Sequence, residues 1–78
     1  MKTASMYLLT RKIWAEYQET RTDFVCVSGD KETLRAFAGV AFPEIIWEND
    51  VAVIAASDDG YGITISEEYF EIVEIEKV

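Results

Sequence analysis

The sequence predicts an α+β domain in which an antiparallel sheet of about five strands carries one short helix packed on one face. Short runs rich in β-branched and aromatic residues recur along the chain and indicate strands. A single segment between them has apolar residues at helical spacing. The 78 residues, of which 50% are hydrophobic, are enough for one domain, residues 1–78, with one core. The expected order of elements is β-β-α-β-β-β.

The first part of the chain predicts two strands. Residues 4–11 are rich in strand formers and predict the first one. Residues 12–22 contain no glycine or proline, so they either lengthen a hairpin or form a wide loop. Residues 24–27 are apolar and predict a second, short strand, which ends at the turn signal Ser28-Gly29-Asp30.

The helix is predicted directly after this turn. Asp30 is a good N-cap, because its carboxylate can accept a hydrogen bond from a backbone N–H of the first turn. Gly39 is a natural C-terminal stop and Pro43 prevents easy continuation, so we expect about two and a half turns. The apolar stripe of this helix consists of Leu34, Phe37, Ala38 and Ala41.

The second half of the chain predicts three more strands. Residues 51–56 form a continuous apolar run, which is typical of a central strand. Residues 57–60, Ser-Asp-Asp-Gly, supply a tight turn to a partner strand at 61–65. Residues 66–68 are polar and predict a corner, after which residues 69–78 form the last strand.

The last segment is open to two interpretations. Tyr69, Ile72 and Val73 are also at helical spacing, and Ser66 could cap a helix. The strand is favoured because β-branched and aromatic residues dominate. Strict alternation fails at Ile72-Val73, so we expect a β-bulge there. The bulge would direct Phe70, Ile72, Val73 and Ile75 inward and Tyr69, Glu71, Glu74 and Glu76 outward.

Charge is distributed unevenly along the chain. Residues 1–43 hold five acids and six bases, whereas residues 44–78 hold ten acids and one base, so the second half accounts for the net charge of −8. Such a field attracts basic surfaces and repels nucleic acid and anionic membranes. We therefore expect a protein partner with a basic surface, such as a nucleic-acid-binding complex, and no direct contact with nucleic acid or membrane.

The sequence offers little for catalysis. It has no histidine, and Cys26 therefore lacks both a catalytic partner and a zinc-site companion. There is no glycine-rich phosphate loop. A small enzyme would need a cleft lined by two convergent carboxylates. We expect a non-enzymatic protein without metal or cofactor. The single cysteine and the absence of a secretory or spanning segment predict a cytoplasmic location.

The acidic half is the predicted binding site. On a strand, alternate carboxylates form an evenly spaced row, and Glu71, Glu74 and Glu76 could imitate the phosphates of DNA. Two aromatic residues among the acids, Trp47 and Tyr69, are candidate anchors. The remaining candidates are acids at turns and loops: Glu44, Glu48, Asp50, Asp58, Asp59, Glu67 and Glu68.

A different class of function fits the same residues. The acids could merely keep the protein soluble and protect an edge strand. The apolar surplus would then serve a structural or self-associating module, a homodimer formed through the helix or the last strand.

The first 40 residues resemble the opening of small phage-encoded proteins. The likeness rests on Met6-Tyr-Leu-Leu-Thr-Arg11, on Tyr17, on Phe24-Val-Cys-Val27 and on Asp30-Lys-Glu-Thr-Leu-Arg-Ala36. It implies a phage or mobile-element setting, with the protein in the cytoplasm of a bacterial host, where small acidic proteins act as inhibitors of host defence, anti-CRISPR proteins included. It implies no catalytic residues. The acidic second half departs from this pattern.

Overall fold

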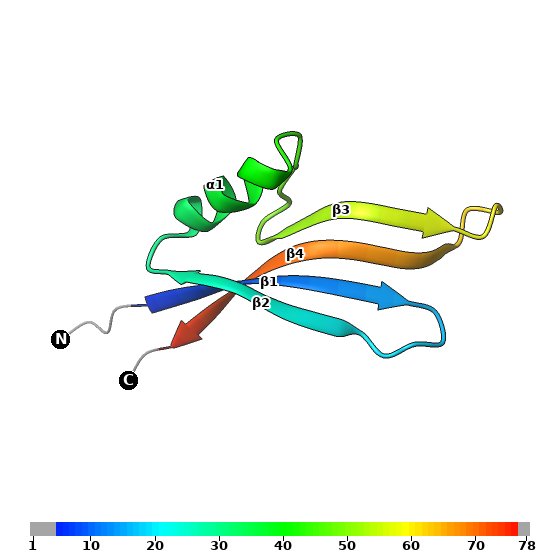
Figure 1. The fold of residues 1–78 in the computed structure, drawn as a ribbon, viewed down its shortest axis with the longest axis horizontal. Helices are drawn as coiled ribbons and strands as arrows, with labels where there is room; N and C mark the ends of the chain where they lie inside the picture. The colour runs from blue at the N-terminus through cyan, green and yellow to red at the C-terminus, as the bar shows by residue number, and fades with distance from the viewer. Residues whose placement is uncertain (1–4, 77–78) are drawn as a thin grey trace.

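The computed structural model describes residues 5–76, with the side chains of residues 5–75, and shows an α+β fold (Figure 1). The predicted fold class is confirmed, but the sheet has four strands rather than five. The elements are β1 (Ser5–Ala15), β2 (Arg21–Ser28), α1 (Lys31–Ala41), β3 (Val51–Asp58) and β4 (Thr64–Glu76).

All neighbouring strands in the sheet are antiparallel, and their order is β2-β1-β4-β3. The first and last strands of the chain are therefore central neighbours. Their register runs without a shift from Ser5 opposite Glu76 to Ala15 opposite Ser66. Each central strand forms a hairpin with an edge strand, β1 with β2 and β4 with β3, and the segment with α1 connects the two edge strands across one face.

The extra predicted strand came from treating residues 66–68 as a corner, which is wrong. Ser66 pairs with Ala15 on one side and with Ser57 on the other. A polar residue in the middle of a sheet keeps both backbone groups satisfied, so its side chain does not force a turn. The turn predicted at residues 57–60 lies between Asp58 and Thr64, so the expected start of the partner strand at residue 61 is also wrong. In this turn Gly60 and Gly62 adopt positive φ angles of 89° and 91°.

The last segment is a strand through Glu76, as favoured, and residues 77–78 lie outside the described part. The bulge expected at Ile72-Val73 is wrong, because the β1–β4 register is unbroken there. Simple alternation holds. Phe70 and Ile72 are buried on the helix side, whereas Val73 and Ile75 lie on the other face. Adjacent apolar residues mean that both faces of this strand are apolar.

The helix begins as predicted and ends two residues later than its predicted stop. The Asp30 carboxylate accepts a hydrogen bond from the backbone N–H of Glu32 at 3.1 Å. Gly39 stays helical, and the N–H of Phe42 donates to the Ala38 carbonyl to close the last turn. Only one ridge of the helix is buried, Leu34 with Ala38, while Phe37 remains exposed.

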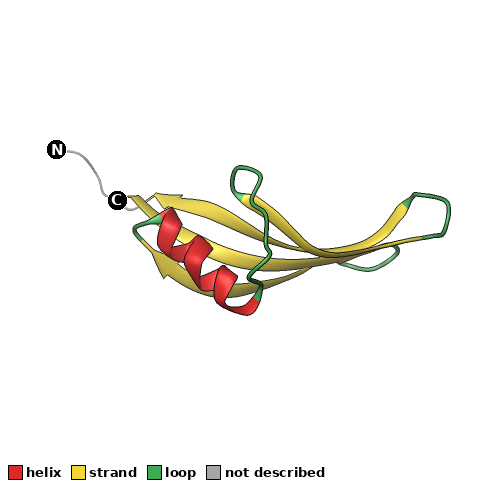
Figure 2. Ribbon diagram, turned by 90° about the horizontal axis from the view of Figure 1, so that it is seen from above, coloured by secondary structure: helices red, strands yellow, loops and turns green. Residues whose placement is uncertain are grey.

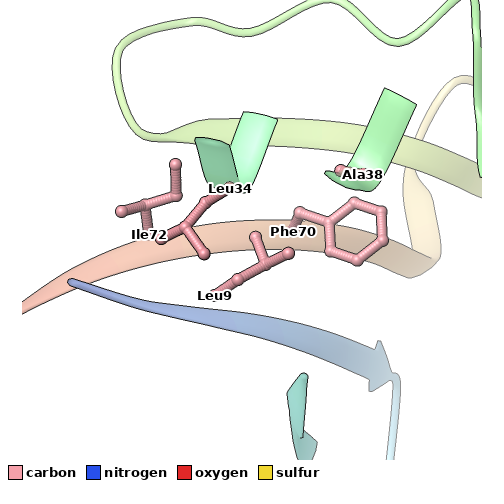
Figure 3. Packing of buried hydrophobic residues seen from close by; sticks show 5 residues of the cluster. All are labelled: Leu9, Leu34, Ala38, Phe70 and Ile72. Atoms are coloured by element: carbon pink, nitrogen blue, oxygen red, sulfur yellow. The ribbon is translucent and has the colours of Figure 1, made fainter. Parts of the chain in front are cut away.

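The core lies between this ridge and the two central strands. Figure 3 shows Leu34 and Ala38 pointing down onto Leu9 of β1 and onto Phe70 and Ile72 of β4. The loop after the helix adds Phe42, Ile45 and Trp47 to the edge of the same cluster. The hydrophobic core is therefore small and confined to one face of the sheet.

The sheet is longer than the layer that covers it. Figure 2 shows α1 lying over one end of the strands, while the other end extends beyond the helix. The radius of gyration is 14.4 Å, against about 11.5 Å for a compact chain of this length. Among the described residues, no helix is long and apolar enough to cross a membrane.

Candidate protein interaction surface

The sheet has one face without a covering layer, which we call the open face. Strand alternation places every second residue of each strand there, opposite α1 and the loop 42–50 (Figure 2). The open face includes Met6, Leu8, Thr10, Lys12 and Trp14 of β1, Thr22, Phe24 and Val27 of β2, Val51, Val53 and Ala56 of β3, and Glu67, Tyr69, Glu71, Val73 and Ile75 of β4.

Large apolar side chains on the open face are exposed to solvent. Phe24 is 75% exposed, Val27 52% and Val53 50%. Val73 and Ile75 are each 41% exposed, and Trp14 is 37% exposed. Isolated exposed apolar residues are normal, but six large ones on one uncovered sheet face indicate a surface that contacts another molecule.

The polar groups near the centre of the open face are satisfied within the chain. The Lys12 ammonium lies 2.6 Å from the Glu71 carboxylate. The hydrogen bond to Glu71 raises the pKa of Lys12, although partial burial opposes this shift. Thr10 is buried, and its hydroxyl donates to the Glu71 carbonyl at 3.0 Å. A partner would therefore meet a surface whose central charges already neutralise one another.

The fold mixes the acids and bases that the sequence separates. Pairing of β1 with β4 brings Arg11 to Glu68 and Lys12 to Glu71. The helix brings Lys31 and Arg35 to Asp50, with Lys31 Nζ at 3.1 Å from its carboxylate. Three predicted partner-binding acids, Asp50, Glu68 and Glu71, are thus engaged in ion pairs with bases from the first half of the chain.

The predicted row of Glu71, Glu74 and Glu76 on one outward face is wrong in geometry. Without the bulge, alternation puts Glu71 on the open face and Glu74 on the helix side, opposite Tyr7. Glu76 pairs with Ser5, and its side chain lies outside the described part. Glu71 and Glu74 therefore lie on opposite faces of the sheet and do not form one row of carboxylates.

The other predicted acids are dispersed. Asp58 and Asp59 accept hydrogen bonds from the backbone N–H groups of Gly60 and Tyr61 and so stabilise the β3–β4 turn. Six of the candidate acids have no ion pair within the described residues: Asp58 and Asp59 of this turn, and Glu44, Glu48, Glu67 and Glu74. Glu44 and Glu48 lie in the loop after α1, whereas Glu67 lies on the open face.

The two predicted aromatic anchors have different environments. Trp47 packs on the core, with its ring 6.4 Å from that of Phe70 and stacked on it. It is therefore a structural residue rather than an exposed anchor. Tyr69 is half-buried on the open face, between Lys12 and Val53.

Sequence reasoning missed the apolar residues of this surface, chiefly Phe24, Val27 and Val53. A signal was present. Adjacent apolar pairs, Leu8-Leu9 and Ile72-Val73, occur in the two central strands, and a strand with such pairs has two apolar faces. One helix of eleven residues can cover only one of those faces.

The described residues contain no cluster suited to metal binding. No three of their cysteine and acidic side chains lie close enough to hold a metal ion. A hollow of about 550 Å³ lies beside the end of α1, between Phe42 and Val53, and Glu44 is its single acidic residue. Comparisons of the chain with protein family models, with curated proteins and with solved structures give no match.

Proposed function

We propose that this protein is a non-enzymatic binding module that contacts a protein partner through the open face of its sheet. The observation that carries the proposal is the set of six large apolar side chains, each more than a third exposed, on a sheet face that no element of residues 5–76 covers. Removing apolar surface from water favours association by roughly 25 cal/mol per Å².

The test compares two substitutions of the same kind at different places. Val73→Glu puts a charge on the open face, whereas Val40→Glu puts one on the outer side of α1, where Val40 is 84% exposed. Wild-type protein and both variants are immobilised and offered a differently tagged second copy and, separately, host lysate.

We expect the wild type and Val40→Glu to retain a protein that Val73→Glu does not retain. That protein can be the tagged copy or a lysate component. Equal retention by all three baits, or no retained protein in either arm, would overturn the proposal. Circular dichroism of both variants checks that the fold is intact.

A second function, docking on a basic surface of a nucleic-acid-handling partner and inhibiting it, is favoured by a separate observation. Each of the five described bases lies within an ion pair, so the described surface presents acids without a free base. Such a surface attracts basic partners and does so less at high salt. Its acids are dispersed rather than arranged in a row.

The test of this second function is charge reversal at acids that have no ion pair among the described residues. Glu48→Lys with Glu74→Lys should abolish salt-sensitive retention of a basic partner, while Val73→Glu should leave it unchanged. Retention that persists in the reversed variant would sink the idea. Glu71→Lys is unsuitable because it would place a second ammonium group against Lys12 and perturb the sheet itself.

A further inference from the structure

We propose that the partner of the open face is a second copy of this chain, so that two sheets pack face to face in a twofold-symmetric dimer. This inference rests on the proposed function and identifies its occupant. In a symmetric dimer the same patch is used by both copies, so the patch must be complementary to itself. Area, charge and the form of the sheet edges support it.

The open face has the area that a stable dimer needs. The β1–β4 pair contributes eleven residue pairs, which at about 3.3 Å per residue make a face about 36 Å long. Four strands about 4.8 Å apart make it about 19 Å wide. Because β2 and β3 have only eight residues each, the footprint is about 600 Å² per copy, which lies at the lower end of the roughly 600–1,000 Å² that stable interfaces bury per partner.

The charge of the open face suits a second copy better than a basic protein. The whole chain has a net charge of −8, so two copies repel one another at most points of their surfaces. The strands of the open face are the exception, because Lys12 and Glu71 neutralise each other there and Glu67 is the one other charged residue that they contribute among those described. Glu48 of the loop after α1 borders this face beside Val51 and Val53. Most of the face is therefore apolar and nearly neutral, which suits a second copy better than a strongly basic protein.

The sheet edges are poorly suited to the alternative form of self-association, strand addition. The edge strand β2 has a register shift opposite Leu9 and Thr10, where Val25 is the extra residue. The edge strand β3 has two shifts, one near Ile54 and one next to Asp58. Such irregularities twist an edge away from a flat pairing partner and protect it from adding strands.

A second sheet would also complete the architecture. Domains bury an apolar sheet face against a second layer, and α1 supplies that layer on one side only (Figure 2). Two sheets packed about 10 Å apart would interleave side chains such as Phe24, Val27 and Val73 between them. The result is a four-layer assembly with helices outside and the two open faces within.

Sedimentation equilibrium of the full chain, across a dilution series, tests the dimer. The wild type and Val40→Glu should show a mass about twice 8.9 kDa that falls on dilution. Val73→Glu should weaken the dimer by at least about 100-fold, because it buries an unpaired charge in each copy. Val53→Ser is a milder second variant, on an edge strand, should Val73→Glu fail to fold.

A spectroscopic readout tests which face is used. In a Trp47→Phe background, Trp14 is the only tryptophan and lies on the open face, so its emission should shift to the blue as the dimer forms. A wild-type mass of one chain at every concentration would overturn the dimer. If the wild type is monomeric but retains a lysate protein that Val73→Glu loses, the dimer is overturned and the proposed binding function is kept. A dimer unaffected by Val73→Glu and Val53→Ser would overturn the face assignment.

Discussion

The two faces of the sheet have similar apolar content but different surroundings. On the helix side, Leu9 and Ile72 are buried under Leu34. On the open face, their chain neighbours Leu8 and Val73 stand opposite one another without a covering element in the described part. The same strands thus have one apolar face buried in the core and a second apolar face that is exposed to solvent. The difference shows that local residue choice made both faces able to pack, whereas the single helix of the described part covers only one of them.

The largest expected effect is a difference in the free energy of unfolding between substitutions on the two faces. Leu9→Ala removes a fully buried side chain and should lower the free energy of unfolding by about 3 kcal/mol. Val73→Ala removes a partly exposed one and should cost less than about 1 kcal/mol at a concentration where the protein is monomeric. Urea denaturation of both variants measures this. Equal losses would mean that the open face is already packed in the single chain.

Substitutions of Trp47 test how much the edge of the core on the helix side contributes to stability. Trp47→Ala should cost about 2 kcal/mol, because its stacked contact with Phe70 and its packing against the core are lost. Trp47→Phe should cost much less, since a ring remains and the buried indole N–H, which has no hydrogen-bond partner among the described residues, is removed. Thermal denaturation of the pair provides the measurement. A large loss for Trp47→Phe would show that the indole N–H has a role.

The N-cap residue Asp30 stabilises α1, the helix that covers one face of the sheet. Asp30 accepts hydrogen bonds from the backbone of Glu32 and from the hydroxyl of Thr33. Asp30→Ala should reduce stability by about 1 kcal/mol, whereas Asp30→Asn should retain most of it. Hydrogen exchange should show faster exchange in α1 and unchanged exchange in the β1–β4 pair. Equal effects of the two substitutions would contradict a capping role.

The smallest effect concerns the ion pair on the open face. Because hydrogen bonding to Glu71 raises the pKa of Lys12 in the folded state, its contribution is complete below the unfolded pKa of lysine and is lost as the pH rises through the folded value. Lys12→Met should therefore cost at most about 1 kcal/mol at neutral pH, and the difference should vanish at strongly alkaline pH. Denaturation curves at both pH values check the sign. A difference that grew with pH would contradict it.

The sequence was informative wherever local chemistry decides structure. Asp30 as a cap, the Asp58 to Gly60 turn and the strand character of residues 69–76 follow from side-chain hydrogen bonding, glycine conformation and β propensity. The hairpin turn after β1 carries no such local signal. It contains no glycine, and Tyr17 takes the left-handed conformation, with φ at 65°, that glycine normally occupies.

The face on which each glutamate of β4 lies could not be predicted from local sequence patterns. Adjacent apolar residues at Ile72-Val73 indicate either a bulge or two apolar faces, and only the unbroken pairing with β1 distinguishes them. The same pairing placed Arg11 and Lys12 beside Glu68 and Glu71. Charge segregation along a chain therefore does not establish charge segregation in space when its two ends are neighbouring strands.

By itself the sequence determined the α+β class, the position of the helix, the apolar strands and the net charge, because propensity, capping and composition act over a few residues. Tertiary structure alone decided which face α1 covers, which acids are neutralised and which apolar residues remain exposed. These depend on contacts between residues as distant as Thr10 and Glu71, whose proximity comes from the central pairing of the first and last strands.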